Sequence, residues 1–234
     1  GRIYMAGLVG TLDAGALENC YNEVAGTITA TETTSSKEYM VGGLIGYISR
    51  QDGIEDQVIS ITNCENKAAI SLAPTKVGGA YIGGVAGQAW AEKKDQTIKF
   101  IRTKNSGAIS LTGATWGGNP QVAGIFAQPN NYTAIELDGC ENSGDITFNA
   151  TASGKPYIGG IVGSETNKVS VLVKNCVNKG KVTFTNATTA VQISPRIGGL
   201  IGNAQQGAMA TGLVNYADIT LRGPFGSTHS NNVS

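Results

Sequence analysis

The chain has 234 residues and carries 17 basic and 17 acidic side chains, so its formal net charge at pH 7 is zero. Neither sign forms a long run, which excludes the basic surface typical of proteins that bind nucleic acids or anionic membranes. No stretch approaches the ~20 consecutive apolar residues of a transmembrane segment. The 33 glycines, a charged fraction of only 15% and abundant Thr, Ser, Asn, Val and Ile indicate a β-rich chain with many tight turns.

A six-residue glycine string recurs along the chain, and its third residue is Gly in all six copies. The copies are Met5-Ala-Gly-Leu-Val-Gly10, Val41-Gly-Gly-Leu-Ile-Gly46, Ile82-Gly-Gly-Val-Ala-Gly87, Val122-Ala-Gly-Ile-Phe-Ala127, Ile158-Gly-Gly-Ile-Val-Gly163 and Ile197-Gly-Gly-Leu-Ile-Gly202. Successive third-position glycines are 36, 41, 40, 36 and 39 residues apart. A drifting period of this size is typical of stacked repeats separated by loops of unequal length.

Two further signals follow each glycine string in the same order. The first is a slot that usually holds Cys, occupied by Cys20, Cys64, Thr103, Cys140, Cys176 and Leu213. The second is an apolar residue followed by a hydroxyl residue: Ile28-Thr29, Ile70-Ser71, Ile109-Ser110, Ile146-Thr147, Val182-Thr183 and Ile219-Thr220. We therefore predict one repeat domain over residues 1–222, and we interpret residues 223–234, which show no strand pattern, as a tail or linker.

Three segments of each repeat have strand character: the glycine string, the segment that runs into the Cys slot, and the apolar-hydroxyl segment. They predict an all-β fold, a right-handed parallel β-helix of about six coils of 36–44 residues with three strands per coil. In the third segment the alternation predicts Ile146 and Phe148 inside and Thr147 outside.

An asparagine follows the Cys slot by two positions in every repeat. Equivalent residues of neighbouring coils lie about 4.8 Å apart, so these side chains are expected to form a structural amide ladder along the axis. The ladder residues are Asn22, Asn66, Asn105, Asn142, Asn178 and Asn215.

The cysteines share one slot in different coils, so we interpret them as buried free thiols rather than as a disulfide framework. A bridge between neighbouring coils, Cys20 to Cys64 or Cys140 to Cys176, is the alternative. We predict no metal site and no cofactor. His229 is the only histidine, and the acidic loop with Asp52, Glu55 and Asp56 lacks the ligand spacing of a calcium loop.

The glycine string has apolar or very small residues at both odd and even positions. In the third segment, by contrast, apolar and polar residues alternate. Leu44, Val85, Ile125, Ile161 and Leu200 alternate with Ile45, Ala86, Phe126, Val162 and Ile201. Strict alternation predicts that one of these columns points outward and must be covered by the chain's own loops, by another domain or by another chain.

Aromatic residues provide a modest signal for binding. The residue before each glycine string forms a column that includes Tyr4, Tyr81 and Tyr157, and the only two tryptophans, Trp90 and Trp116, lie near the third and fourth copies. These five residues are our candidate platform for stacking on a glycan or a protein. The alternative is that the column shields the edge of the glycine sheet and that the tryptophans fill loop cores.

The glycine string followed by Asn-Cys-x-Asn-x-Gly-x-[Ile/Val]-Thr, clearest from Ile158 to Phe184, resembles the GLUG-type repeats of bacterial surface proteins, including adhesin-like proteins of gut Bacteroidetes. The resemblance covers nearly the whole chain. It implies an extracellular or outer-surface-anchored module, linked to further domains of the same polypeptide, and it supplies no catalytic residue. Ala replaces the first Gly in two copies, and Cys is absent from two slots.

Three hypotheses on function follow. The first is a non-enzymatic module that adheres to a host or bacterial surface glycan or protein. The second is a structural spacer that presents another domain. The third, a polysaccharide-degrading enzyme, requires clustered carboxylates on adjacent coils, but the outward slot before the hydroxyl pairs alternates as Asp145, Lys181 and Asp218. That alternation favours cross-coil charge pairing, so we predict no enzyme.

Overall fold

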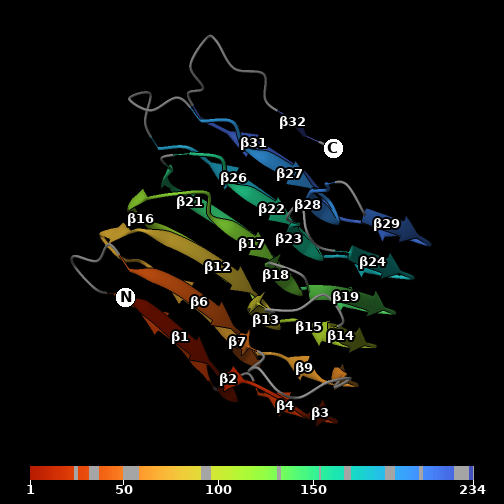
Figure 1. Ribbon diagram of the computed structural model, residues 1–234. Coiled ribbons are helices and arrows are strands. Elements are labelled where there is room, and N and C mark those ends of the chain that lie inside the picture. Colours follow the sequence, from red (N-terminus) through yellow and green to blue (C-terminus); the bar gives the residue numbers. More distant parts are fainter. Residues whose placement is uncertain are drawn as a thin grey trace.

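The structure, a computed structural model, describes residues 1–23, 26–31, 37–49, 58–90, 96–130, 133–152, 154–165, 170–187, 193–205, 208–223 and 232–233. All regular elements of these residues are β-strands. Strands of successive repeats pair in parallel and stack into a β-solenoid of about five turns, seen in Figure 1 from β1 (Arg2–Ala6) to β31 (Ile219–Arg222). The prediction of an all-β parallel solenoid is confirmed.

Five sheets, which we name A to E in the order in which a coil passes through them, follow the solenoid axis. Sheet A contains β1, β6 (Glu38–Gly42), β12 (Gly79–Gly83), β17 (Gln121–Ala123), β22 (Tyr157–Gly159), β27 (Arg196–Gly198) and β32 (Asn232–Val233). Sheet B contains β2 (Val9–Leu12), β7 (Ile45–Ser49), β13 (Ala86–Trp90), β18 (Phe126–Asn130), β23 (Val162–Ser164) and β28 (Ile201–Asn203). Sheet C contains β3 (Ala16–Glu18), β8 (Ile59–Thr62), β14 (Gln96–Ile101), β19 (Thr133–Asp138), β24 (Ser170–Lys174) and β29 (Ala208–Thr211). Sheet D contains β4 (Tyr21–Asn22), β9 (Glu65–Asn66), β15 (Lys104–Asn105), β20 (Glu141–Asn142), β25 (Val177–Asn178) and β30 (Val214–Asn215). Sheet E contains β5 (Thr27–Ala30), β10 (Ala69–Leu72), β16 (Ile109–Trp116), β21 (Ile146–Ala152), β26 (Val182–Thr185) and β31, and β11 (Lys76–Val77) also pairs with β16.

A coil therefore passes through five sheets, and the prediction of three strands per coil is wrong. Two of the predicted segments turn a corner. The segment before the Cys slot bends at one residue with positive φ in every repeat: Asn19, Asn63, Arg102, Gly139, Asn175 and Gly212. Asn and Gly enter this left-handed region more readily than other residues. The corner ends the strand of sheet C and starts the strand of sheet D.

The glycine string bends between sheets A and B. The carbonyl oxygen of Val85 accepts hydrogen bonds from the backbone N–H groups of both Leu44 and Ile45. Two residues of one coil thus face one residue of the next, as in a β-bulge, and the alternation is interrupted. Leu44 and Ile45 both point into the core and are fully buried. The prediction that one of these columns points outward is therefore wrong.

The core consists of two lobes. Sheets A and E enclose the first, which contains Tyr39, Trp116 and Phe148. Sheets B and C enclose the second, which contains Phe100 and Phe126. The sheets bring together side chains that are about one repeat apart in sequence, so apolar burial in both lobes joins each coil to its neighbours.

Two predictions about core positions are confirmed. In sheet E, Ile146 and Phe148 are buried, whereas Thr147 is half-buried on the outer face. The four cysteines are free, and all except Cys20 are buried. Thr103 fits the same slot because its hydroxyl donates to the carbonyl oxygen of Ile61 at 2.9 Å.

The asparagine ladder lies between the two lobes and is confirmed. Nδ2 of each asparagine donates to Oδ1 of the asparagine in the next coil at 2.8 or 2.9 Å, from Asn22 through to Asn215. From Asn66 onward, Nδ2 also donates to the backbone carbonyl oxygen two residues later. The inner four ladder residues are completely buried: Asn66, Asn105, Asn142 and Asn178.

The ladder explains the glycine at the third position of every string. A Cβ on Gly84 would lie 2.3 Å from Cγ of Asn105 and 2.1 Å from the carbonyl oxygen of Gly124. Both distances are far below van der Waals contact. The solenoid therefore narrows here to a waist, at which the backbone of the glycine string lies directly against the amide ladder.

Residues 223–234, for which the sequence shows no strand pattern, contribute β32. Asn232 pairs with Arg196, and Val233 pairs with Ile197. The step from Arg196 to Asn232 is 36 residues, the same as the step from Gln121 to Tyr157, which also pair. β32 thus pairs with β27 in the register of the repeats and extends sheet A by one strand.

Candidate functional site

The bend of the glycine string forms a concave crease on the outer side of sheets A and B. Two columns of side chains face each other across it. Sheet A contributes Tyr4, Met40, Tyr81, Gln121, Tyr157 and Arg196, and sheet B contributes Thr11, Tyr47, Gln88, Gln128, Ser164 and Asn203. We call these two columns the crease. It contains the tyrosines that the sequence singles out for binding.

A glycine deepens the crease. A Cβ on Gly87 would lie 2.5 Å from the carbonyl oxygen of Gly46 and 2.7 Å from the backbone nitrogen of Val41. Glycine at this position lets the strands of sheets A and B approach each other backbone to backbone.

The side chains of the crease cover one another. The rings of Tyr4 and Tyr47 stack with their centroids 4.9 Å apart, and Nε2 of Gln88 donates to Oε1 of Gln128 at 2.9 Å. Met40, Tyr47, Gln88, Gln121, Gln128, Ser164 and Asn203 are all buried. The crease is thus filled by its own residues.

A polar network continues the crease in the last two coils. Nη1 of Arg196 donates to Oδ1 of Asn203, and Nδ2 of Asn203 donates to the hydroxyl oxygen of Ser164 at 3.0 Å. The guanidinium of Arg196 lies 5.6 Å from the centroid of the Tyr157 ring. Arg196 therefore occupies one face of that ring, which a ligand would otherwise contact.

Burial raises the pKa of two phenols of the crease. It raises the pKa of Tyr47 to about 12, with a further contribution from Tyr4. It also raises the pKa of Tyr81, and a hydrogen bond with Gln88 opposes that rise. Like ordinary phenols, both hydroxyls are protonated at neutral pH and can donate hydrogen bonds, which suits contact with sugar hydroxyls or peptide carbonyls.

The five residues of the predicted binding platform do not converge. Tyr4, Tyr81 and Tyr157 do line up in the crease, and Tyr4 is 39% exposed. Trp116 is fully buried in the first lobe, edge-to-face with Phe148 at 5.5 Å, so its assignment to the platform is wrong. Trp90 is half-buried at the end of sheet B, whereas Trp116 ends a strand of sheet E at the opposite end of the coil.

The outer face of sheets C and D carries charges that pair between coils. Nζ of Lys174 lies 2.8 Å from a carboxylate oxygen of Glu136 and 3.3 Å from one of Asp138. The bond with Lys174 lowers the pKa of Glu136, and a hydrogen bond from Asn175 lowers that of Asp138. Both carboxylates are therefore ionised and occupied by partners in neighbouring coils.

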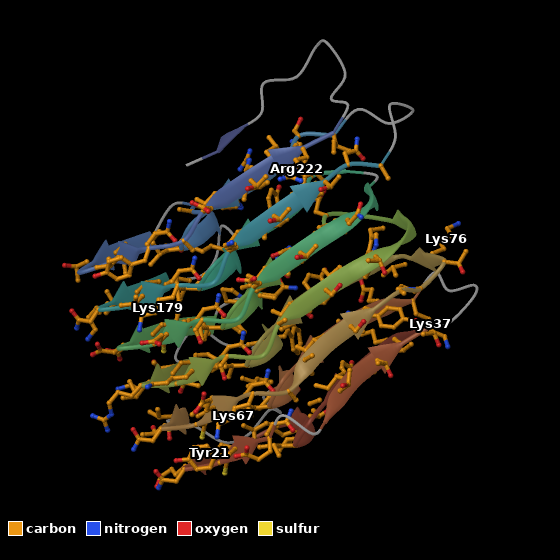
Figure 2. All side chains as sticks on the ribbon, turned by 180° about the vertical axis from the view of Figure 1, so that it is seen from behind. Tyr21, Lys37, Lys67, Lys76, Lys179 and Arg222 are labelled. Carbon is orange, nitrogen blue, oxygen red and sulfur yellow. The ribbon has the colours of Figure 1, made fainter. Side chains whose placement is uncertain are left out.

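Lys67 and Lys179 continue this pattern along sheet D. Figure 2 shows both lysines with Tyr21 on one side of the stack, at different levels. Nζ of Lys67 pairs with Glu23 at 3.1 Å and lies 5.7 Å from the centroid of the Tyr21 ring. Nζ of Lys179 pairs with a carboxylate oxygen of Glu141 at 2.9 Å.

The predicted pairing of Asp145 with Lys181 takes a different form. Oδ1 of Asp145 accepts a hydrogen bond from the backbone N–H of Lys181 at 2.8 Å, so the carboxylate contacts the main chain of the next coil rather than its ammonium group. This bond fixes the entry to β26 and leaves Asp145 in a structural role.

Glu165 is a buried acid that sequence reasoning missed. It follows β23 and is only 1% exposed. Its Oε2 accepts a hydrogen bond from the backbone N–H of Gln205 at 3.1 Å, whereas its Oε1 has no partner among the described residues. The sequence does contain a signal, because the equivalent positions in sheet B are Ile48, Ala89 and Pro129. Burial raises the pKa of Glu165.

We expect Glu165→Gln to flatten the pH dependence of stability. The unfolded chain releases this proton near the ordinary pKa of 4.5, whereas the fold retains it to higher pH, so the parent loses stability as pH rises through the raised pKa. Glu165→Gln should therefore melt above the parent at about pH 8 and approach it at about pH 4. Glu136→Gln is the control with the opposite sign, because Lys174 stabilises ionised Glu136. Identical melting profiles for the parent and Glu165→Gln would refute the prediction.

No group of three or more His, Cys, Asp or Glu side chains is placed to hold a metal ion within the described ranges. The acidic residues Asp52, Glu55 and Asp56 lie outside those ranges, as does His229. Over the same part of the chain, no helix has the length and hydrophobicity required to cross a membrane.

No known family model, curated protein or solved structure matches the chain.

Proposed function

We propose that the chain is a non-enzymatic module whose main role is structural: a rigid β-solenoid spacer that holds other parts of a secreted or surface-anchored bacterial protein apart. The observation that carries this proposal is the amide ladder, in which the six asparagines two positions after the Cys slots are bonded in one unbroken row from Asn22 to Asn215. Each coil is bonded to the next at its centre as well as at its sheets. Such a stack transmits force along its axis without hinges.

The proposal includes a right-handed winding of six coils. Parallel crossover connections are right-handed in nearly all proteins because of the twist of the strands. Sheets B, C and D each contain six strands, one from each glycine-string repeat, which gives a height of about 29 Å at about 4.8 Å per coil. The extracellular location and the relation to GLUG-type repeats rest on the resemblance of the repeat motif, clearest from Ile158 to Phe184, to those repeats.

The non-catalytic role rests on how the carboxylates are used. Glu136, Asp138 and Glu141 form ion pairs with lysines of other coils, and Asp145 accepts a backbone hydrogen bond from the next coil. A general acid or base needs a free position beside a substrate. These four groups instead join one coil to another.

Binding of a surface glycan or protein along the crease is the second candidate function. Tyr4, Tyr81 and Tyr157 occupy every second position of the sheet A column, so they are spaced about 9.6 Å apart, close to the length of one disaccharide unit. Partly exposed aromatic rings at a regular spacing suit contacts with successive sugars of a linear glycan.

An array of bacterial and host glycans and host surface proteins separates the two functions. As a spacer, the parent chain is expected to bind nothing above background. A hit that is lost in Tyr81→Ala plus Tyr157→Ala, and kept in the control Tyr21→Ala plus Tyr216→Ala, would instead establish binding at the crease. Both control residues are exposed aromatics away from the crease: Tyr21 lies in β4 of sheet D, and Tyr216 directly follows β30.

Force spectroscopy tests the spacer role positively. When the chain is pulled from both ends between two reference domains, we expect one cooperative unfolding event that releases most of its length. Extension without a force peak, or coil-by-coil yielding at negligible force, would contradict a load-bearing spacer.

A further inference from the structure

Arg196 is the only charged side chain of the crease. It is half-buried, and its guanidinium is held from two sides. Nη1 donates to Oδ1 of Asn203, and the guanidinium carbon lies 5.6 Å from the centroid of the Tyr157 ring. Asn203 is itself fixed by the bond from its Nδ2 to the hydroxyl oxygen of Ser164 at 3.0 Å. A side chain held in this way loses little conformational freedom when a ligand binds.

The positive charge of Arg196 is not neutralised by a carboxylate of the described residues, since none of their ion pairs includes it. From residue 146 onward the chain has seven basic side chains and only two acidic ones, Glu165 and Asp218. Glu165 occupies the position of Ile48, which faces the second lobe. Asp218 directly precedes β31 of sheet E, across the first lobe from sheet A. This end of the crease is therefore electropositive.

The free edge of the guanidinium has the geometry of a carboxylate site. Because Nη1 is bonded to Asn203, the edge formed by Nε and Nη2 has no partner among the described residues. These two parallel N–H groups form the fork that binds both oxygens of a carboxylate. Lys155 lies two residues before Tyr157 and is exposed, and the described residues provide no ion pair for it either. A ligand with a carboxylate suits this end of the crease.

A buried acceptor on the other side of Tyr157 indicates a second group of the ligand. Gln121 and Arg196 are the neighbours of Tyr157 in sheet A, one in each adjacent coil. Oε1 of Gln121 is buried and has no hydrogen-bond partner among the described residues, which destabilises the free protein. Rotation of this amide toward the opening of the crease offers the oxygen to a ligand hydroxyl, about 9.6 Å along the column from Arg196. A carboxylate and a hydroxyl at this spacing are typical of an acidic oligosaccharide.

We infer that the crease binds a glycan that carries a carboxylate, as uronic and sialic acids do, with the carboxylate on Nε and Nη2 of Arg196 and a hydroxyl on Oε1 of Gln121. The inference rests on the second candidate function, binding along the crease, and names the class of its ligand. It is compatible with the spacer role, because a module that holds other domains apart can also carry a ligand. Neutral glycans lack the group that pairs with Arg196.

The test compares acidic oligosaccharides with neutral counterparts by nuclear magnetic resonance titration of the full chain. Trigalacturonate is paired with its methyl ester, and sialyllactose is paired with lactose. We expect at least one acid to bind, and its neutral counterpart to bind about tenfold more weakly or less, because it offers no ion pair to Arg196. The acid that binds distinguishes a uronic from a sialic acid site. This comparison uses the parent chain alone, so it does not depend on the folding of any variant.

Variants locate the carboxylate on the protein. Arg196→Gln should lower the affinity for the acid about tenfold or more. Arg196→Lys keeps the charge and loses the fork, so it should also bind more weakly than the parent. The control Arg2→Gln removes an arginine of the same sheet that is paired with Glu38 at 3.0 Å, and it should bind as the parent does. Thermal melting checks that each variant is folded.

Equal binding of an acid and its neutral counterpart would overturn the inference, and so would an unchanged affinity in folded Arg196→Gln. Both outcomes leave the crease as a binding site, with a ligand of another class. Absence of binding by all four probes would overturn the inference as well. In that case an array hit that is lost in Tyr81→Ala plus Tyr157→Ala would still support binding at the crease, so the two failures are distinguishable.

Discussion

We expect Gly84→Ala to destabilise the fold by about 3 kcal/mol or more, or to prevent folding. The added methyl group would lie 2.1 Å from the carbonyl oxygen of Gly124 and 2.3 Å from Cγ of Asn105. Neither neighbour can move freely, because Gly124 is backbone in the next coil and Asn105 is held in the ladder by hydrogen bonds to Asn66 and Asn142. Relief of the clash therefore requires the two sides of the waist to separate.

Gly79→Ala is the matched control, since Gly79 begins β12, the strand of the same coil that ends directly before Gly84. Its added Cβ would have as its nearest neighbour Cγ of the Glu38 side chain, at 3.5 Å, which is ordinary contact. We expect a change below about 1 kcal/mol. Urea unfolding followed by circular dichroism measures both variants. Equal stabilities for Gly84→Ala and Gly79→Ala would show that the waist has room for a methyl group.

We expect Asn142→Ala to lower the free energy of unfolding by about 3 kcal/mol. The substitution leaves three buried groups without their bonds: the Nδ2 hydrogen of Asn105, Oδ1 of Asn178 and the carbonyl oxygen of Gly144. Each unsatisfied buried group costs about 1 to 3 kcal/mol, and relaxation of the neighbours recovers part of the sum.

Asn149→Ala is the control for the ladder, because Asn149 is exposed on the outer face of the adjoining strand β21. It should change stability by no more than about 0.5 kcal/mol. Thermal and urea unfolding of the two alanine variants give the comparison. If Asn142→Ala melts within a degree of Asn149→Ala, the ladder contributes nothing to stability.

The repeat could be recognised from sequence because its signals depend only on spacing. Parallel stacking, the six ladder asparagines and the inside-outside alternation of sheet E all follow from residues that recur once per coil in a regular strand. Ile146 and Phe148 alternate strictly with Thr147, and the structure places them as predicted. Regular strands preserve the relation between sequence parity and the direction of a side chain.

The five-sheet cross-section could not be predicted because two bends break that relation. Arg102 occupies the left-handed corner between sheets C and D at φ 48°, and nothing in its residue type indicates such a bend. The bulge at Leu44 and Ile45 directs consecutive side chains into one core. Alternation along the glycine string therefore does not give the direction of its side chains, and both apolar columns are buried in the second lobe without a separate covering chain.

The candidate site was predicted in part. The tyrosine column lies where the sequence placed it, since it depends on register alone. Trp116 was misassigned because β16 is a long strand that carries it into the first lobe, against Phe148. The partners in sheet B, Tyr47 and Gln88, were missed because their facing position depends on the bend.

Hydrogen exchange of the asparagine side-chain amides, measured by nuclear magnetic resonance, shows whether a buried amide ladder joins the coils. We expect the Nδ2 protons of Asn66, Asn105 and Asn142 to exchange only when the domain unfolds, whereas those of exposed Asn149 exchange at once. Exchange of the ladder amides as fast as that of Asn149 would contradict it.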